Sequence, residues 1–246
     1  MSGHSKWSTI KRKKGALDAK RGKIFSRLVK EISIAVKEGG PDPDANPRLR
    51  LALQNAKGAN MPKENVERAI SKADNEGDNL AEVTFEGYGP NGIAVFIECL
   101  TDNNQRTVGM VRAVFNKRGG NLGTNGSLGF LFDRKGIFNV PKGDMDPDEF
   151  QLDIIDAGVE DFEVSDDMFI ITTAMEDFGS VQKKLDEMGI QVESASLQRI
   201  PNDTKVLSVE DSQKIIKMID EFEDIDDVQN VYHNLEMTDE LMNVLN

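Results

Sequence analysis

The chain has 246 residues, 38% of them hydrophobic and 30% charged, which is typical of a folded protein and excludes a wholly disordered one. No run approaches the roughly 20 apolar residues of a membrane helix, and the N-terminus MSGHSKWSTIKRKKG lacks the apolar core of a secretory signal. Cys99 is the only cysteine, which excludes an internal disulfide and predicts a reducing compartment, with the cytoplasm as the expected location.

Charge divides the chain into a basic end and an acidic body. The formal net charge is -13, yet residues 1–72 hold 17 Lys and Arg against 7 Asp and Glu, and residues 73–246 hold 13 against 36. Such a division is typical of a polyanion-binding end joined to a body that repels the same polyanion. Function is therefore sought first at the basic end.

Three helices are predicted at this end. The first spans 16–38, with an apolar residue at every fourth position from Ile24 to Val36. The second begins at Asn46-Pro47, a capping residue followed by proline at the first helical position, and the third repeats this pattern at Met61-Pro62. Their complementary apolar stripes predict a small bundle.

The pattern then changes to that of strands. Two strands, 82–88 and 93–100, flank the turn Pro90-Asn91-Gly92 and predict a hairpin, which is followed by a helix at 104–118. The sequence next predicts, in chain order, strands 127–132 and 136–140, helix 147–157, strands 160–164 and 168–173, helix 177–188, strand 190–199, a helix carrying Ile215 to Phe222, and a strand at 228–233.

From strand 136–140 onward the order is β-α-β-β-α-β, the split βαβ or ferredoxin-like pattern. The β-β-α-β before it would be completed by the final helix and strand. We therefore expect an α+β multidomain protein with one α+β domain inserted in another. The expected domains are a basic helical domain at 1–78, an α+β domain at 79–134 plus 206–246, and an acidic α+β domain at 135–205.

The basic end is the candidate binding site. Residues 1–40 carry 11 basic and 3 acidic side chains, whereas a solvated helix face usually mixes both signs. Lys and Arg neutralise phosphates, and an aromatic ring can stack on an exposed base. The predicted nucleic-acid-binding residues are Lys6, Trp7, Lys11, Arg12, Lys13, Lys14, Lys20, Arg21 and Lys23. For Trp7, a role in pinning the N-terminal arm to the bundle is an equal alternative.

Two other motifs are better explained by local structure. Residues 87–92, GYGPNG, match the dinucleotide pattern G-x-G-x-x-G, but that site needs a helix next, and a strand follows. Asp144, Asp146 and Asp148 imitate the start of a calcium loop without its glycine and its final glutamate, so a cap at Asp146 is predicted instead.

The glycines between 119 and 129 leave two readings open, a loop that approaches RNA and an internal turn. No catalytic constellation is evident, because the two histidines, His4 and His233, lie at opposite ends of the chain and nucleotide-binding and nucleophile-elbow motifs are absent. We expect no enzyme activity, metal, cofactor or small-molecule substrate, and no membrane partner. His4 is expected to help bind phosphate, and His233 to be structural.

Several spaced motifs resemble the YebC/PmpR family, whose mitochondrial branch is the translational activator of cytochrome c oxidase. They run in order along the whole chain: GHSKW at 3–7, KRGKIF at 20–25, NMP at 60–62, YGP at 88–90, TDN at 101–103, RT at 106–107, GG at 119–120, LG at 122–123, GS at 126–127 and VQNV at 228–231. The resemblance implies a helical N-terminal domain and two α+β domains. It also implies a regulator of gene expression, traditionally described as a DNA-binding transcriptional regulator and more recently placed on the ribosome at difficult sequences such as proline runs.

Three hypotheses follow. The first is a ribosome-bound translation factor whose basic end holds ribosomal RNA. The second is a DNA-binding transcriptional regulator that reads bases with the helix at 47–60, through Arg48, Arg50, Gln54, Asn55 and Lys57. The third is an acidic scaffold that recruits a basic partner, which leaves the basic end without a role.

Overall fold

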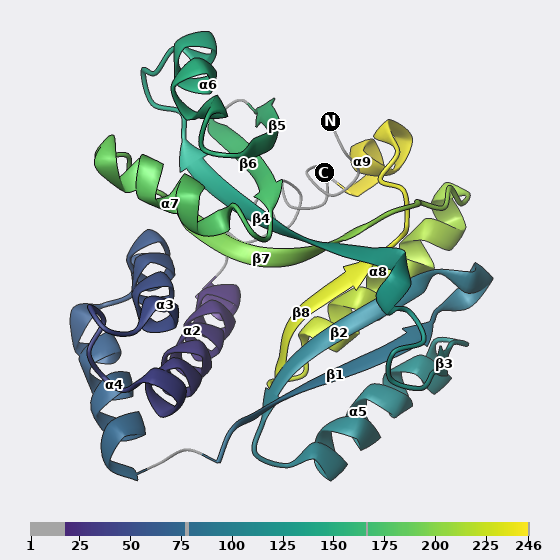
Figure 1. Cartoon of the computed structure of the whole chain (residues 1–246). Coiled ribbons are helices and arrows are strands. Elements are labelled where there is room, and N and C mark those ends of the chain that lie inside the picture. The colour runs from purple at the N-terminus through teal and green to yellow at the C-terminus, as the bar shows by residue number, and fades with distance from the viewer. Residues whose placement is uncertain (1–17, 77–78, 166, 246) are drawn as a thin grey trace. The chain divides into compact units, whose positions relative to one another are not determined.

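The computed structural model describes residues 18–76, 79–165 and 167–245 (Figure 1). The described chain groups into two compact units. The first contains the described residues within 1–34, 77–133 and 200–246, and the second contains 35–76 and 134–199. The first helix, α2 (Asp18–Gly39), contributes residues to both units.

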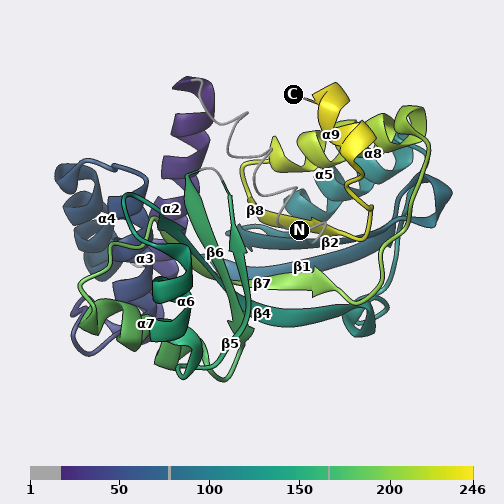
Figure 2. The same cartoon turned by 90° about the horizontal axis from the view of Figure 1, so that it is seen from above.

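The first unit is built on a four-stranded sheet in the order β3-β1-β2-β8. Its strands are β1 (Ala81–Tyr88), β2 (Ala94–Thr101), β3 (Asn121–Leu122) and β8 (Val228–His233). Its other elements are the short turns η1 (Pro90–Gly92) and η2 (Gly129–Leu131) and the helices α5 (Asn104–Lys117), α8 (Val209–Glu223) and α9 (Asp239–Leu245). Figure 2 shows these three helices on one side of the sheet.

Strand β2 lies at the centre of this unit because it is apolar on both faces. Val95, Ile97 and Cys99 face the core shared with α5 and α8, which also contains Phe115 and Phe222. On the other face of β2, Ala94 and Phe96 belong to a smaller cluster that includes Leu128 and Phe132. The hairpin expected from the sequence is confirmed, since β1 pairs antiparallel with β2 and Tyr88 lies opposite Ala94.

The second unit contains a sheet in the order β5-β6-β4-β7. Its elements in chain order are α3 (Pro47–Gly58), α4 (Lys63–Glu76), β4 (Phe132–Pro141), α6 (Pro147–Ile155), β5 (Val159–Val164), β6 (Met168–Ala174), α7 (Phe178–Glu187) and β7 (Ser194–Pro201). From β4 onward this is the β-α-β-β-α-β order. Two predicted caps are confirmed: Asn46 accepts a hydrogen bond from Leu49 N–H, and Asp146 accepts from Asp148 and Glu149.

The fold class is confirmed, because within the described residues three N-terminal helices precede two four-stranded sheets with accompanying helices. The division into domains at 1–78, 79–134 plus 206–246, and 135–205 stays a prediction. Within the described residues, none of the helices is long and apolar enough to cross a membrane.

Three local expectations differ from the structure, and two of its elements were not expected. In place of the strand expected at 127–132, residues 127–131 form no strand: the N–H groups of Gly126 and Leu128 bond to the carboxylate of Glu86, and β4 begins at Phe132. Strand β7 begins at Ser194 rather than at 190. The short β3 and the C-terminal α9 lack a sequence pattern long enough to predict them. Ile24, assigned to the buried stripe of the first helix, is 42% exposed.

Candidate nucleic-acid interface

The structure describes part of the predicted binding site. Lys6, Trp7, Lys11, Arg12, Lys13 and Lys14, like His4, lie outside the described residues. Lys20 lies in α2, but its side chain is outside what the structure describes. Arg21 and Lys23 are described in the first two turns of α2, and the guanidinium of Arg21 lies over the ring of Phe25 at 5.4 Å from its centroid.

One face of α2 carries Lys23, Arg27 and Lys30, at spacings of four and three residues that bring side chains together on a helix. All three contact a short acidic segment, residues 223–227, which begins at the last residue of α8 and ends just before β8 and which we call the acidic turn. Lys23 forms an ion pair with Asp224, and Arg27 donates to the carbonyl of Glu223 at 3.0 Å. That carbonyl belongs to the last turn of α8, where carbonyls lack helical partners and carry partial negative charge.

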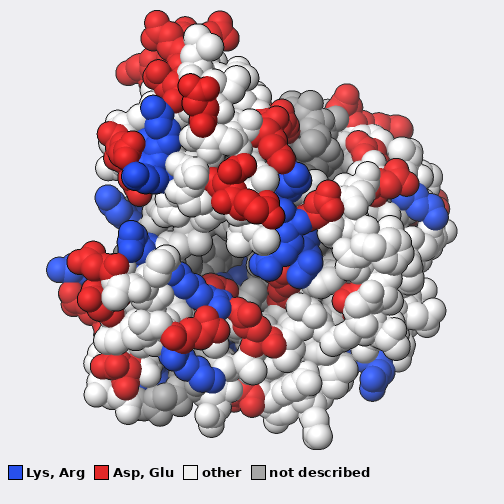
Figure 3. Space-filling model, viewed as in Figure 1, with Lys and Arg blue, Asp and Glu red and all other residues white. Residues whose placement is uncertain are grey.

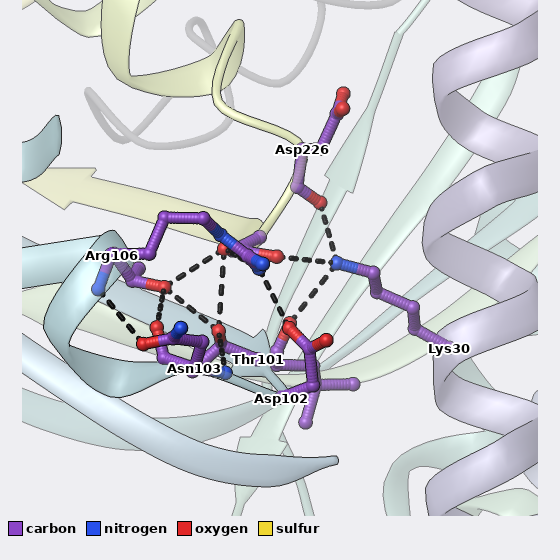
Figure 4. A network of polar contacts seen from close by, with 9 residues as sticks. Lys30, Thr101, Asp102, Asn103, Arg106 and Asp226 are labelled. Carbon is purple, nitrogen blue, oxygen red and sulfur yellow. Dashed lines mark hydrogen bonds and ion pairs between the residues drawn. The ribbon is translucent and has the colours of Figure 1, made fainter. Parts of the chain in front are cut away.

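Lys30 makes the deepest contact of this face (Figure 4). Its Nζ donates to the Asp227 carboxylate at 2.9 Å, to the Asp226 carbonyl at 2.9 Å and to the Leu100 carbonyl at 3.1 Å. Asp227 is 3% exposed, so its carboxylate requires partners in the protein. This cluster fastens the first part of α2 to the sheet of the first unit.

The other oxygen of Asp227 is held by residues at the start of α5. It accepts from Arg106 Nη2 at 2.8 Å and from the Thr107 hydroxyl at 2.8 Å, and Arg106 also pairs with Asp102 at 2.7 Å. Burial alone would raise the pKa of the Asp227 carboxyl. The hydrogen bonds from Arg106, Lys30 and Thr107 outweigh burial and lower this pKa to about 2.

The polar side chains proposed as base readers on α3 are mostly engaged within the second unit. Arg48 pairs with Glu38 at 2.7 Å, and Arg50 donates to the carbonyls of Pro43 and Asp44. Gln54 accepts from Gln182 at 2.9 Å.

Asn55 exchanges two hydrogen bonds with the backbone of Ala195 on β7, at 2.8 and 2.9 Å. Lys57 remains exposed. Of the five residues proposed as base readers, Gln54 and Asn55 therefore bond to α7 and β7, and Arg48 and Arg50 bond to residues before α3 or at the end of α2.

Hydrogen bonds to Glu86 fix part of the glycine-rich segment at 119–129, which is largely exposed, and its approach to RNA stays a prediction. The buried carboxylate of Glu86 accepts from the N–H groups of Gly126 and Leu128, and the Glu86 carbonyl accepts from Gly123 at 2.7 Å. Gly119 and Gly126 have φ values of 75° and 83°, which favour glycine. Sequence reasoning missed Glu86, because an acidic residue within a strand gives no sign that it is buried.

The remaining motifs have structural explanations. His233, 8% exposed, accepts a hydrogen bond from Leu235 N–H through Nδ1 at 3.2 Å. Residues 90–92 form a turn that leads into β2, so G-x-G-x-x-G is a hairpin here. Acidic side chains gather over α6 at the top of Figure 3, where Asp148, Asp153 and Asp156 are exposed. Among the described residues, no group of three His, Cys, Asp or Glu is placed to hold a metal ion.

The structure thus defines a multidomain α+β protein with a basic helical end and an acidic body. Two family models match it, one described as the TACO1/YebC protein N-terminal domain at residues 5–76 and one as the TACO1/YebC second and third domain at 80–235. The chain belongs to the TACO1/YebC family, which confirms the resemblance seen in its motifs.

Similar proteins agree with this assignment. The chain is 50% identical to the "Probable transcriptional regulatory protein ORF2U" of Hathewaya histolytica, over 96% of this chain and 97% of the relative. It is 51% identical to a "Probable transcriptional regulatory protein" of Amoebophilus asiaticus, over 96% and 98%. The crystal structure of a conserved hypothetical protein from Aquifex aeolicus is similar with a TM-score of 0.83 at 43% identity, covering 91% of this chain and 93% of that one.

Proposed function

We propose that this chain is a non-enzymatic, nucleic-acid-binding regulator of gene expression that acts on the ribosome. Its basic end would hold phosphates of ribosomal RNA and so assist the translation of difficult sequences such as proline runs. The observation that carries the proposal is the separation of charge, 17 basic against 7 acidic residues in 1–72 and 13 against 36 in the rest. A basic end attracts a phosphate backbone, and an acidic body keeps the rest of the chain from wrapping on it.

The hydrogen bonds that polar side chains of α3 already make favour binding to the phosphate backbone of a nucleic acid over recognition of its bases. A recognition helix needs several side chains free to reach base edges in the major groove. On α3, the polar groups of Arg48, Gln54 and Asn55 bond within the second unit. Binding through Lys and Arg at the N-terminal end needs no such helix.

A DNA-binding transcriptional regulator is the second candidate, favoured by the names of the relatives. It predicts a preference for one promoter over scrambled DNA of about a thousandfold or more at physiological salt. A preference below about tenfold would count against it. The ribosomal proposal predicts no such preference.

The deciding experiment is co-sedimentation with ribosomes on a sucrose gradient at physiological and at raised salt. A variant with alanine at Lys11, Arg12, Lys13 and Lys14 tests the basic end, and a control removes as many basic charges elsewhere, at Arg112, Lys142, Lys183 and Lys217. We expect salt-sensitive migration with the large subunit that the first variant loses and the control keeps. Wild-type protein that stays at the top of the gradient at both salts would refute ribosome binding, and equal binding by both variants would refute the site.

A further inference from the structure

The contact between α2 and the acidic turn has a consequence for binding, because it places carboxylates and carbonyls where phosphates would lie. Lys23, Arg27 and Lys30 share one helix face, and each donates to an oxygen of residues 223–227. Arg27 meets a carbonyl at the C-terminal end of α8, which carries partial negative charge. Lys23 meets the carboxylate of Asp224 directly beside it.

We propose that the acidic turn is an intramolecular competitor of nucleic acid, in which Asp224 occupies the position of a phosphate on the basic face of α2. This inference rests on the proposed function, since it concerns how the same basic end is regulated. A polyanion with enough phosphates would displace Asp224 and take over Lys23 and Arg27, whereas a short or weakly charged polyanion would not. The acidic turn therefore sets a minimum number of phosphates that a polyanion needs in order to bind to this face of α2.

The ion pairs Lys23–Asp224 and Lys30–Asp227 differ in their exposure to water, and this decides which of them a polyanion can displace. The side chains of Lys23 and Asp224 are 43% and 68% exposed, and ion pairs so accessible to water contribute little and break easily. Asp227 keeps only 5% side-chain exposure and binds Lys30 and Arg106 at once. Lys30 is therefore a fixed anchor, and the end of α2 around Lys23 is the exchangeable part.

The chain offers a matched control two residues away. Asp226 is exposed, belongs to the same turn and contributes only its backbone carbonyl to the contact with Lys30. In Figure 4 its carboxylate points away from Lys30. Asp224→Asn and Asp226→Asn thus change the net charge equally, but only the first removes the contact with α2.

The test is direct binding of a fluorescein-labelled RNA of mixed sequence, about 30 nucleotides long, by the full chain at several salt concentrations. We expect Asp224→Asn to raise the affinity about two- to fivefold, the range that loss of an exposed ion pair allows, and Asp226→Asn to raise it less. In a double variant, Lys23→Ala should abolish the gain from Asp224→Asn, because the released side chain is then missing.

Three results would overturn the inference. Equal gains from Asp224→Asn and Asp226→Asn would mean that only net charge matters. A gain that persists with Lys23→Ala would mean that Asp224 acts elsewhere. Failure of the wild type and of every variant to bind RNA or an equally labelled DNA duplex would refute the proposed function together with this inference, whereas the first two results would refute the inference alone.

Discussion

The ammonium of Lys30 and the carboxylate of Asp227 lie 2.9 Å apart, although 197 positions separate them in the chain. The pair joins α2 to the turn before β8, and Arg106 and Thr107 complete the surroundings of the carboxylate. A buried carboxylate and its two cationic partners stabilise the fold only together, because removal of one of them leaves a buried charge without its partner.

Asp227→Asn should therefore destabilise the first unit. We expect a loss of about 2–3 kcal/mol in the free energy of unfolding in urea, less than for a fully buried pair, because Lys30 and Arg106 keep 21% and 46% side-chain exposure. Asp226→Asn is the control and should stay within about 0.5 kcal/mol of wild type. Equal losses in both variants would show that the turn tolerates no change, and would remove the special role of Asp227.

The same carboxylate should make stability depend on pH. Its folded pKa of about 2 lies below the ordinary 3.8, so the unfolded chain binds the proton more readily. The contribution, about 2 kcal/mol, is therefore fully present above pH ~4 and is lost as the pH falls towards 2. Urea titrations from pH 5 to about 2 should bring wild type and Asp227→Asn together, and a constant gap would contradict the assignment.

Glu86→Gln tests whether a carboxylate holds the glycine-rich turn. An amide offers one acceptor oxygen and turns its NH₂ towards the other donor, so one of the two N–H groups of Gly126 and Leu128 loses its partner. We expect a cost of about 1–3 kcal/mol and faster hydrogen exchange at both amides. Asp133→Asn, an exposed residue nearby, is the control. Unchanged exchange at Gly126 and Leu128 would mean that the turn is held by its glycines alone.

Individual elements show how much of the fold can be predicted from local sequence. The cap at Asn46 and the hairpin around residues 90–92 depend on neighbouring residues, and both were predicted. Residues 127–131 were wrongly expected to belong to a strand, because the backbone N–H of Leu128 bonds to the side chain of Glu86, 42 positions earlier. Local patterns do not record such pairings.

At the candidate site, too, contacts between residues far apart in the chain could not be predicted from the sequence. The run of basic residues predicts in the sequence which end of the chain binds, since charge composition does not depend on the fold. That Lys23 and Lys30 meet residues 224 and 227 depends on the tertiary structure. Similarly, Gln54 and Asn55 of α3 looked available for DNA in the sequence, and only their contacts with residues 182 and 195 show that they bond within the second unit.

Arg118 and Glu221 link α5 to α8 at the surface. Hydrogen bonds from Arg118 first, and then from Lys117, lower the pKa of Glu221 to about 2. Arg118→Ala should move this pKa upward towards its ordinary value, and Lys117→Ala should move it less. Carboxyl chemical shifts followed through an NMR pH titration measure both, and an equal effect of the two variants would contradict the order of the two contacts.

Two glycines with opposite surroundings test the packing of the first sheet. A Cβ at Gly87 would lie 2.5 Å from the Asn121 carbonyl oxygen and 2.7 Å from the Phe115 ring, so Gly87→Ala must push β3 and α5 away from β1. We expect a loss of about 1–3 kcal/mol by urea unfolding. Gly109 lies inside α5 with nothing within 4 Å of the added atom, and Gly109→Ala should stabilise by about 0.5–1 kcal/mol, because alanine loses less backbone entropy in a helix. If Gly87→Ala were neutral, the close approach of β3 to β1 would not be a constraint on this sheet, whatever the result at Gly109.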